Sequence, residues 1–272
     1  MIGRLALAGM ALALGTSAAW AQNECAAGKT LKDGVLTVAT GNPAYFPWVI
    51  DNDPTSGDGF EAAVAYEIAA RMGFDRAHVA WTSTTFDQAI QPGPKDFDFN
   101  LQQYSITPER AETIDFSDPY YSATQAVLVR KPTVDAGATP TLASLKSLKW
   151  GLAAGTTAPE LIKTLVAPDS DPLLYDDTAD ASEALKAGQI DATLMDLPTA
   201  LYTAAAVLDD GVVLGQFPNG DVAADSFGLV FEKGNPLRDC ANAALAEMSA
   251  DGKLAEIETE WLEAATGVPV IK

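Results

Sequence analysis

Residues 96–121 constrain the fold most, because they lead a strand directly into a group of polar side chains. Polar and apolar residues alternate over 97–101, which is the pattern of a short strand. Further on, Thr107 is followed by a proline, the combination typical of a helix N-cap and first helical position. We therefore expect Ser105, the N–H groups of that helical turn and the Arg110 guanidinium to meet at the end of a strand. Such a group suits a carboxylate, because a helix N-terminus is partly positive and Arg offers a planar pair of donors.

Strand-like and helix-like segments alternate along the rest of the chain, which predicts an α/β fold with mostly parallel sheets. The run 130–140, rich in Thr, Ala, Gly and Pro, marks a boundary between two such units. In open α/β sheets ligands bind beyond the carboxyl ends of strands, so each unit is expected to supply half of a site. The strands are predicted at residues 35–39, 78–81, 97–101, 125–129, 148–152, 173–175, 190–195, 212–214 and 227–231.

Residues 1–21 have the pattern of a signal peptide, with a basic residue, an apolar run over 5–14 and the cleavage site Ala19-Trp20-Ala21. The apolar run is too short to span a bilayer, so no membrane insertion is expected after cleavage. The formal net charge of −20 argues against nucleic acid and anionic lipid as partners, since phosphates require clustered Lys and Arg.

Cys25 and Cys240 are the only cysteines. An exported chain meets an oxidising compartment, which predicts one disulfide between them. Two buried free thiols are the alternative.

SITPERAE at 105–112, followed by IDFSDPYY at 114–121, resembles the amino-acid-binding proteins of bacterial ABC importers, solute-binding protein family 3. The other matching stretches, in the family's order, are LTVATGNPAYFPWVI, GDGFEAAVAYEIAARMG, WGLAAGTT, AGQIDATLMD, FGLVFEKGNPL and MSADGKLAEIETEW. The resemblance implies a two-lobed periplasmic-binding-protein fold, each lobe a mostly parallel sheet flanked by helices, with a ligand cleft between the lobes. Lobe 1 is then expected to comprise 22–129 and 226–272, and lobe 2 to comprise 130–225, with two hinge crossings.

The same resemblance implies that Arg110 clamps the α-carboxylate of an amino acid, with help from Ser105 and Thr157. Asp196 is then expected to accept hydrogen bonds from the α-ammonium group. The further ligand-binding residues expected on this basis are Tyr45, Trp48, Gln103, Asn42, Thr156 and Phe86.

Each main candidate also has a structural interpretation. Arg110 can form a surface ion pair with Asp115 or Glu112. Thr157 and Asp196 are both good helix caps, the former in a capping box with Glu160.

The remaining candidates have such interpretations too. Tyr45 and Trp48 can belong to the core, because aromatic side chains bury large areas. Asn42 is also a common turn residue.

Asn42 stands where family members that take cationic amino acids commonly carry Asp, so a neutral polar or modestly apolar ligand is expected. Enzymatic groups are scarce: His78 is the only histidine, and the phosphate-loop pattern is absent from the sequence. The alternative is a periplasmic dehydratase of the same fold, which needs a protonated buried acid that the sequence does not identify. We therefore predict a periplasmic, monomeric binding protein rather than an enzyme, without metal or cofactor, whose partners are an amino acid and a membrane ABC permease.

Overall fold

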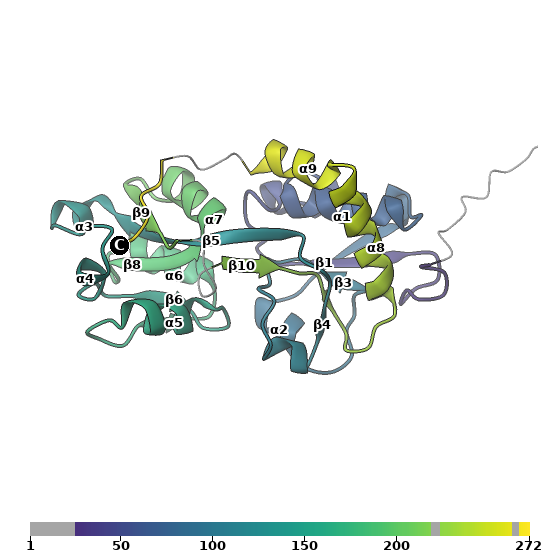
Figure 1. Ribbon diagram of the computed structural model, residues 1–272, viewed down its shortest axis with the longest axis horizontal. Helices are drawn as coiled ribbons and strands as arrows, with labels where there is room; N and C mark the ends of the chain where they lie inside the picture. Colours follow the sequence, from purple (N-terminus) through teal and green to yellow (C-terminus); the bar gives the residue numbers. More distant parts are fainter. Residues whose placement is uncertain (1–24, 219–223, 263–266) are drawn as a thin grey trace, which may run out of the picture.

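The computed structural model describes residues 25–218, 224–262 and 267–272, arranged as two lobes joined by a pair of strands (Figure 1). The expected signal peptide, residues 1–21, lies outside the described residues.

Lobe 1 contains a five-stranded sheet with the order β2-β1-β3-β11-β4. β1 pairs in parallel with β2 and β3, whereas β11 is antiparallel to β3 and β4. These strands are β1 (Leu36–Thr40), β2 (Val79–Ser83), β3 (Phe99–Asn100), β4 (Asp115–Phe116) and β11 (Val230–Phe231).

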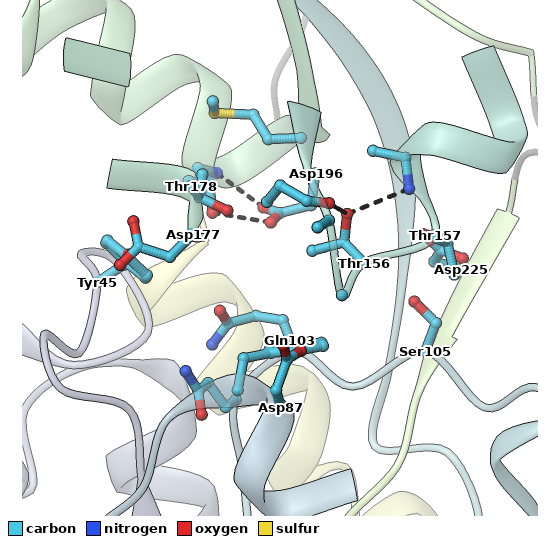
Figure 2. A pocket seen from close by; sticks show the side chains of 18 of the residues that line it. Tyr45, Asp87, Gln103, Ser105, Thr156, Thr157, Asp177, Thr178, Asp196 and Asp225 are labelled. Carbon is cyan, nitrogen blue, oxygen red and sulfur yellow. Dashed lines mark hydrogen bonds between the residues drawn. The ribbon is translucent and has the colours of Figure 1, made fainter. Parts of the chain in front are cut away.

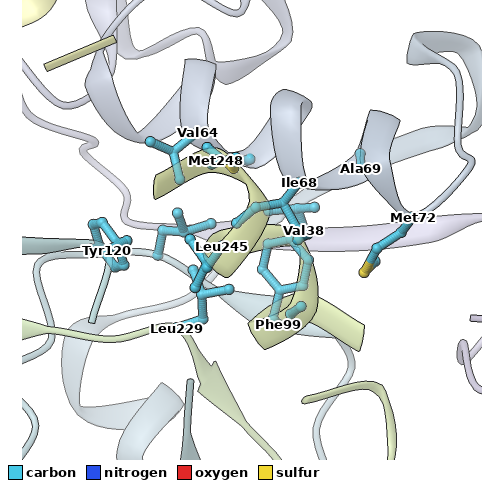
Figure 3. Close-up of a cluster of buried hydrophobic side chains, with 14 of the residues drawn as sticks. Val38, Val64, Ile68, Ala69, Met72, Phe99, Tyr120, Leu229, Leu245 and Met248 are labelled. Atoms are coloured by element: carbon cyan, nitrogen blue, oxygen red, sulfur yellow. The ribbon is translucent and has the colours of Figure 1, made fainter. Parts of the chain in front are cut away.

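Helices α1 (Phe60–Arg71), α8 (Leu237–Ala250) and α9 (Lys253–Trp261) pack together on one side of this sheet (Figure 1). Apolar residues recur every three or four positions along α1 and α8, so each helix turns one face to the core. Figure 3 shows Ile68 of α1 and Leu245 of α8 meeting Phe99 of the sheet. The smaller elements are α2 (Phe86–Ile90) and the 3-10 turns Ile50–Asn52, Pro54–Ser56, Arg76–His78 and Arg110–Glu112.

Lobe 2 is built around β5 (Tyr121–Arg130), which pairs antiparallel with β8 and β9. β6 and β7 pair in parallel, and Trp150 joins β6 to β8 through a parallel bridge with Ala192. The other strands are β6 (Gly151–Ala153), β7 (Leu173–Tyr175), β8 (Ala192–Asp196) and β9 (Gly211–Gln216). The helices are α3 (Lys131–Asp135), α4 (Leu142–Leu145), α5 (Ala158–Leu161), α6 (Thr178–Lys186) and α7 (Leu197–Tyr202), with π-helical turns at Ile162–Val166 and Thr203–Val207.

The lobes are connected by a two-stranded antiparallel ribbon of β5 and β10 (Ala224–Phe227). β5 is a single long strand that runs from one lobe into the other (Figure 1). Its first half pairs with β10, and from Gln125 onward it pairs with β8 of lobe 2. The crossing therefore occurs inside a strand near Gln125, a few residues before the predicted boundary at 129/130.

The end of the chain differs from the predicted lobe assignment. Residues 226–272 were expected in lobe 1, but the last residues pack on lobe 2. Ile271 lies in a lobe 2 core with Trp150, and its N–H donates to the Gln216 carbonyl at 2.9 Å. Lys272 likewise donates to the Pro140 carbonyl at 3.1 Å. The reason is long-range pairing: a buried isoleucine and backbone hydrogen bonds to β9 hold this segment, and local periodicity does not report such contacts.

Two further expectations require correction. The sheets are mixed rather than mostly parallel, because β5 and β11 run against their neighbours as the chain leaves and re-enters lobe 1. The helix expected from Thr107 is only the 3-10 turn Arg110–Glu112, because the chain must turn back at once into β4. It therefore offers no helix N-terminus for an anion.

The predicted disulfide between Cys25 and Cys240 is present, with Cα atoms 5.7 Å apart. It ties the start of the described chain to α8 in the core of lobe 1. Across the ranges that the structure describes, none of the helices has the length and apolar character needed to cross a membrane.

Candidate ligand-binding site between the lobes

A cavity of about 320 Å³ lies between the lobes and draws its walls from both. Its size is in the range of small-molecule sites. The strand ends β3, β6 and β8 deliver chain segments to it, as expected for α/β sheets. The predicted residues that line it are Asn42, Tyr45, Phe86, Gln103, Ser105, Arg110, Thr156, Thr157 and Asp196. Figure 2 labels six of them: Tyr45, Gln103, Ser105, Thr156, Thr157 and Asp196.

Trp48 is the predicted binding residue that does not line the cavity. Its side chain is fully buried in the lobe 1 core, where it meets Phe60, Tyr121 and Phe227 edge-on. The two neighbouring aromatics of one loop therefore divide, with Tyr45 in the cavity wall and Trp48 in the core. The Trp48 indole nitrogen still donates across the lobes, to the Thr199 hydroxyl at 2.8 Å.

Arg110 reaches into the cavity from lobe 1. Its Nη1 donates to the Ser105 carbonyl and its Nη2 to the Gly155 carbonyl of lobe 2, each at 2.9 Å. The guanidinium carbon also lies 5.3 Å from the centroid of the Phe86 ring. Burial lowers the pKa of Arg110, and Asp225 opposes that shift.

The surface ion pair proposed for Arg110 is not what the structure has. Asp115 instead receives Lys233 at 3.0 Å, and Arg110 faces the cavity.

Asp196 closes the lobe 2 side, at the point where β8 becomes α7. Its Oδ1 accepts from the Thr199 N–H and its Oδ2 from the Thr199 hydroxyl, each at 2.8 Å. Asp196 is thus both a helix cap and a cavity residue. Burial raises the pKa of Asp196 to about 6, and the nearby Asp225 adds to this shift.

Thr157 is not a capping residue, since its side chain makes no cap hydrogen bond to α5. Its hydroxyl donates to Asp225 at 3.2 Å. The hydroxyl of Thr156, one residue before the N-cap position, accepts instead from the Ala158 N–H at 3.3 Å and donates to the Ala153 carbonyl at 2.8 Å.

Gln103 is held by a buried acid that the sequence analysis missed. Its backbone has a φ of 50°, a left-handed conformation unusual for a residue other than glycine. Glu61 of α1 accepts from the Gln103 N–H at 2.8 Å, from its side-chain amide, and from the Tyr120 hydroxyl. Burial raises the pKa of Glu61 to about 7. The sequence did contain a sign that Glu61 is buried, because it falls on the same side of α1 as the apolar Ala65 and Ile68.

Four more acids line the cavity that the sequence analysis did not single out: Asp87, Asp176, Asp177 and Asp225. With Asp196 they face one arginine among the described lining residues, so the cavity is electronegative. Part of this charge could have been anticipated, because Asp87 and Asp177 stand at the starts of α2 and α6, where acids are common. In the described part of the chain, no three His, Cys, Asp or Glu side chains are grouped so as to hold a metal ion.

The model of the bacterial extracellular solute-binding proteins, family 3, matches residues 36–264. The chain therefore belongs to this family. It is 30% identical over 268 residues to the L-cystine-binding protein TcyJ of Escherichia coli K12, covering 97% of each chain. It is also 30% identical over 221 residues to the glutamine-binding protein GlnH of Bacillus subtilis, covering 78% of this chain and 76% of that one.

Solved structures agree with the two-lobed fold. An ancestral arginine-binding protein bound to arginine superposes with a TM-score of 0.69 at 30% identity, covering 84% of this chain and 98% of that one. The ancestral amino-acid-binding protein AncCDT-1, a precursor of cyclohexadienyl dehydratase, gives 0.68 at 29% identity, with 85% and 96% covered.

Proposed function

We propose that this protein captures a single α-amino acid between its lobes and delivers it, as a periplasmic monomer, to a membrane ABC permease. One observation carries the proposal: an arginine from lobe 1 and an aspartate from lobe 2, Arg110 and Asp196, line the same cavity. An α-amino acid is a zwitterion, so it needs one group of each sign a short distance apart. Relatives named for cystine, glutamine and arginine binding support this ligand class.

The proposed contacts are strong enough for ordinary transport affinities. Hydrogen bonds to charged groups contribute roughly 1.5–3 kcal/mol each. Several of them reach the ~8 kcal/mol of micromolar binding after the cost of association. Because the carboxylate partner belongs to lobe 1 and the ammonium partner to lobe 2, a ligand that carries both groups favours the closed arrangement of the lobes.

The charge of the cavity bears on the ligand side chain. From the sequence, Asn42 predicts a neutral side chain on the ligand. The acids Asp87 and Asp177 were not part of that reasoning. We propose a ligand whose side chain is neutral or cationic, because an anionic side chain would be repelled.

Binding without catalysis is the function that we propose. A dehydratase needs a protonated acid facing its substrate. Two buried acids have a raised pKa. Asp196, with a pKa of about 6, lines the cavity, but Thr199 engages both of its oxygens and we assign it to the ligand's ammonium group. Glu61, with a pKa of about 7, is not among the residues lining the cavity, and its oxygens are engaged by Gln103 and Tyr120.

Thermal unfolding with the twenty L-amino acids and L-cystine, followed by calorimetric titration, tests the proposal. A bound ligand in excess raises the melting temperature by mass action. We expect at least one zwitterion to stabilise the protein, and its α-amide and its N-acetyl derivative to do so much less. Absence of stabilisation by every amino acid, or turnover of an arogenate-like substrate at enzymatic rates, would overturn the proposal.

A further inference from the structure

The strand that returns from lobe 2 places Asp225 near Arg110, Ser105 and Thr157, the residues that we propose bind the ligand carboxylate. Asp225 lies on β10, opposite Ala123 of β5. Ser105 forms an antiparallel bridge with Phe227, which fixes β10 beside the segment that carries Ser105 and Arg110. Asp225 and Phe227 are two residues apart on a strand, so their side chains point the same way, and both line the cavity. Figure 2 shows Asp225 beside Thr157, with Ser105 nearby.

The Asp225 carboxylate is already surrounded by donors. Its Oδ2 accepts from the Gln125 side-chain amide at 2.6 Å and from the Thr157 hydroxyl at 3.2 Å. Burial raises the pKa of Asp225, and Thr157, Ser105 and Arg110 oppose that shift because they favour the ionised form. Asp196, the other acid near it, is the partner proposed for the ligand's ammonium group.

This donor set overlaps the one that the proposed function assigns to the ligand. Ser105, Arg110 and Thr157 are the proposed partners of an α-carboxylate. A threonine hydroxyl has a single hydrogen, so Thr157 cannot donate to Asp225 and to a ligand carboxylate at the same time. Two carboxylates that share one group of donors also repel each other.

We propose that Asp225 is an internal competitor for the carboxylate donors: an incoming amino acid must displace it from the Thr157 hydroxyl, and it competes with Asp225 for the charge of Arg110. Asp225 then sets the affinity: it makes binding weaker than the clamp alone would allow, and it eases release. This inference rests on the proposed amino-acid function.

The test compares Asp225→Asn with wild type and with Asp171→Asn, by calorimetric titration. Asparagine keeps the size of the side chain and removes its charge. Asp171 is an exposed acid outside the cavity lining, so its variant controls for the loss of one negative charge. The probes are the L-amino acid that binds wild type most tightly, chosen from the twenty and L-cystine, and the α-amide of that amino acid.

We expect Asp225→Asn to bind the amino acid about tenfold more tightly than wild type, and Asp225→Ser to change the affinity in the same direction. The α-amide should gain much less, since its neutral amide oxygen is not repelled by Asp225, and Asp171→Asn should match wild type for both probes. Unchanged or weaker binding of the amino acid by Asp225→Asn and Asp225→Ser would overturn the inference and leave amino-acid binding intact. Failure of every amino acid to bind any of these proteins would overturn the proposed function and this inference with it.

Discussion

At the scale of single residues, the site depends on a partly buried arginine, Arg110, and a buried acid, Glu61. Arg110 is held by the carbonyls of Ser105 and Gly155, one from each lobe, so its guanidinium is oriented before any ligand contact. Such a buried guanidinium retains its charge and its planar set of donors. Glu61 lies behind Gln103 and fixes the left-handed backbone of that residue.

Replacing Arg110 should separate ligand binding from folding. We expect Arg110→Ala to weaken amino-acid binding by ~2–5 kcal/mol, roughly 30-fold to several thousand-fold, because it removes the partner of the ligand carboxylate. Arg110→Lys should also lose much of the affinity, because a point charge cannot reproduce the planar fork. The free energy of unfolding should fall by only ~1 kcal/mol for each lost hydrogen bond to Ser105 and Gly155. Calorimetric titration and urea unfolding of both variants measure the two effects. Affinity within threefold of wild type would rule out the clamp.

Glu61 should make stability depend on pH. Its pKa rises from the ordinary value of 4.5 to about 7 in the folded protein, so folding favours the protonated form. The stability that Glu61 contributes is therefore fully present below about pH 4.5 and is lost as the pH rises through about 7. The shift corresponds to a loss of about 3 kcal/mol.

The Glu61→Gln variant isolates this contribution, because the acids Asp196 and Asp225 still titrate in both proteins. The free energy of unfolding of both proteins is measured by urea unfolding at pH 5 and at pH 8. From pH 5 to pH 8, wild type should lose a few kcal/mol more stability than Glu61→Gln does. Parallel pH profiles for the two proteins would contradict the assignment.

At the scale of elements, α1 is joined to the cavity wall through its own N-terminus. The helix has no side-chain cap, and its first N–H groups donate instead to loop carbonyls: Phe60 to Pro47 at 3.0 Å, and Glu61 to Trp48 at 2.9 Å. Gly59 permits this close approach, with a φ of 105° and an added Cβ only 2.5 Å from the Trp48 carbonyl oxygen. The loop that carries Tyr45 into the cavity is therefore anchored to the core by a helix end.

We expect Gly59→Ala to lower the free energy of unfolding by ~2–4 kcal/mol, since it combines an unfavourable φ with a clash against backbone. Gly252→Ala is the matched control, because Gly252 also has a positive φ, 82°, but nothing lies within 4 Å of an added Cβ. That variant should lose about 1 kcal/mol from strain alone. Urea unfolding compares the two, and equal losses would show that the close approach at Gly59 carries no cost.

At the scale of the whole molecule, the two lobes touch each other directly as well as enclosing the cavity. Trp48 donates to Thr199 across the lobes, and Phe46 stacks on Tyr202 of α7 with ring centroids 4.3 Å apart. The β5–β10 ribbon holds the lobes in register behind these contacts. A ligand bound as we propose adds to an existing interface between the lobes, and we expect the net charge of the shared cavity to select its side chain.

L-Glutamine and L-glutamate form a matched pair for this charge. We expect glutamine to bind at least about tenfold more tightly, because glutamate adds a carboxylate to a cavity that already holds several acids. Competition titration at low salt and at 0.5 M NaCl measures the ratio of the two affinities. This ratio should be smaller at high salt, because salt screens the repulsion between glutamate and the acids of the cavity. Glutamate binding as tightly as glutamine would contradict the electronegative cavity.

The sequence by itself determined most of the helices and strands and the order of the family's motifs along the chain. Strand and helix positions follow from hydrophobic periodicity and from turn residues, which are local properties of the chain. Local chemistry also singled out Arg110 and Ser105, since both follow closely on a predicted strand, whereas Asp196 was predicted from the family resemblance. The Cys25–Cys240 disulfide was accessible because the chain has only two cysteines.

Tertiary structure alone decided which side chains share the cavity. Tyr45 and Trp48 have the same local chemistry, and only packing against Phe227 and Thr199 places one in the wall and the other in the core. Asp225 reaches the cavity beside Thr157 because β10 pairs with β5, a contact between residues about a hundred positions apart. The final residues settle on lobe 2 for the same reason. Such contacts depend on how distant segments pack together, and a local sequence pattern carries no record of that packing.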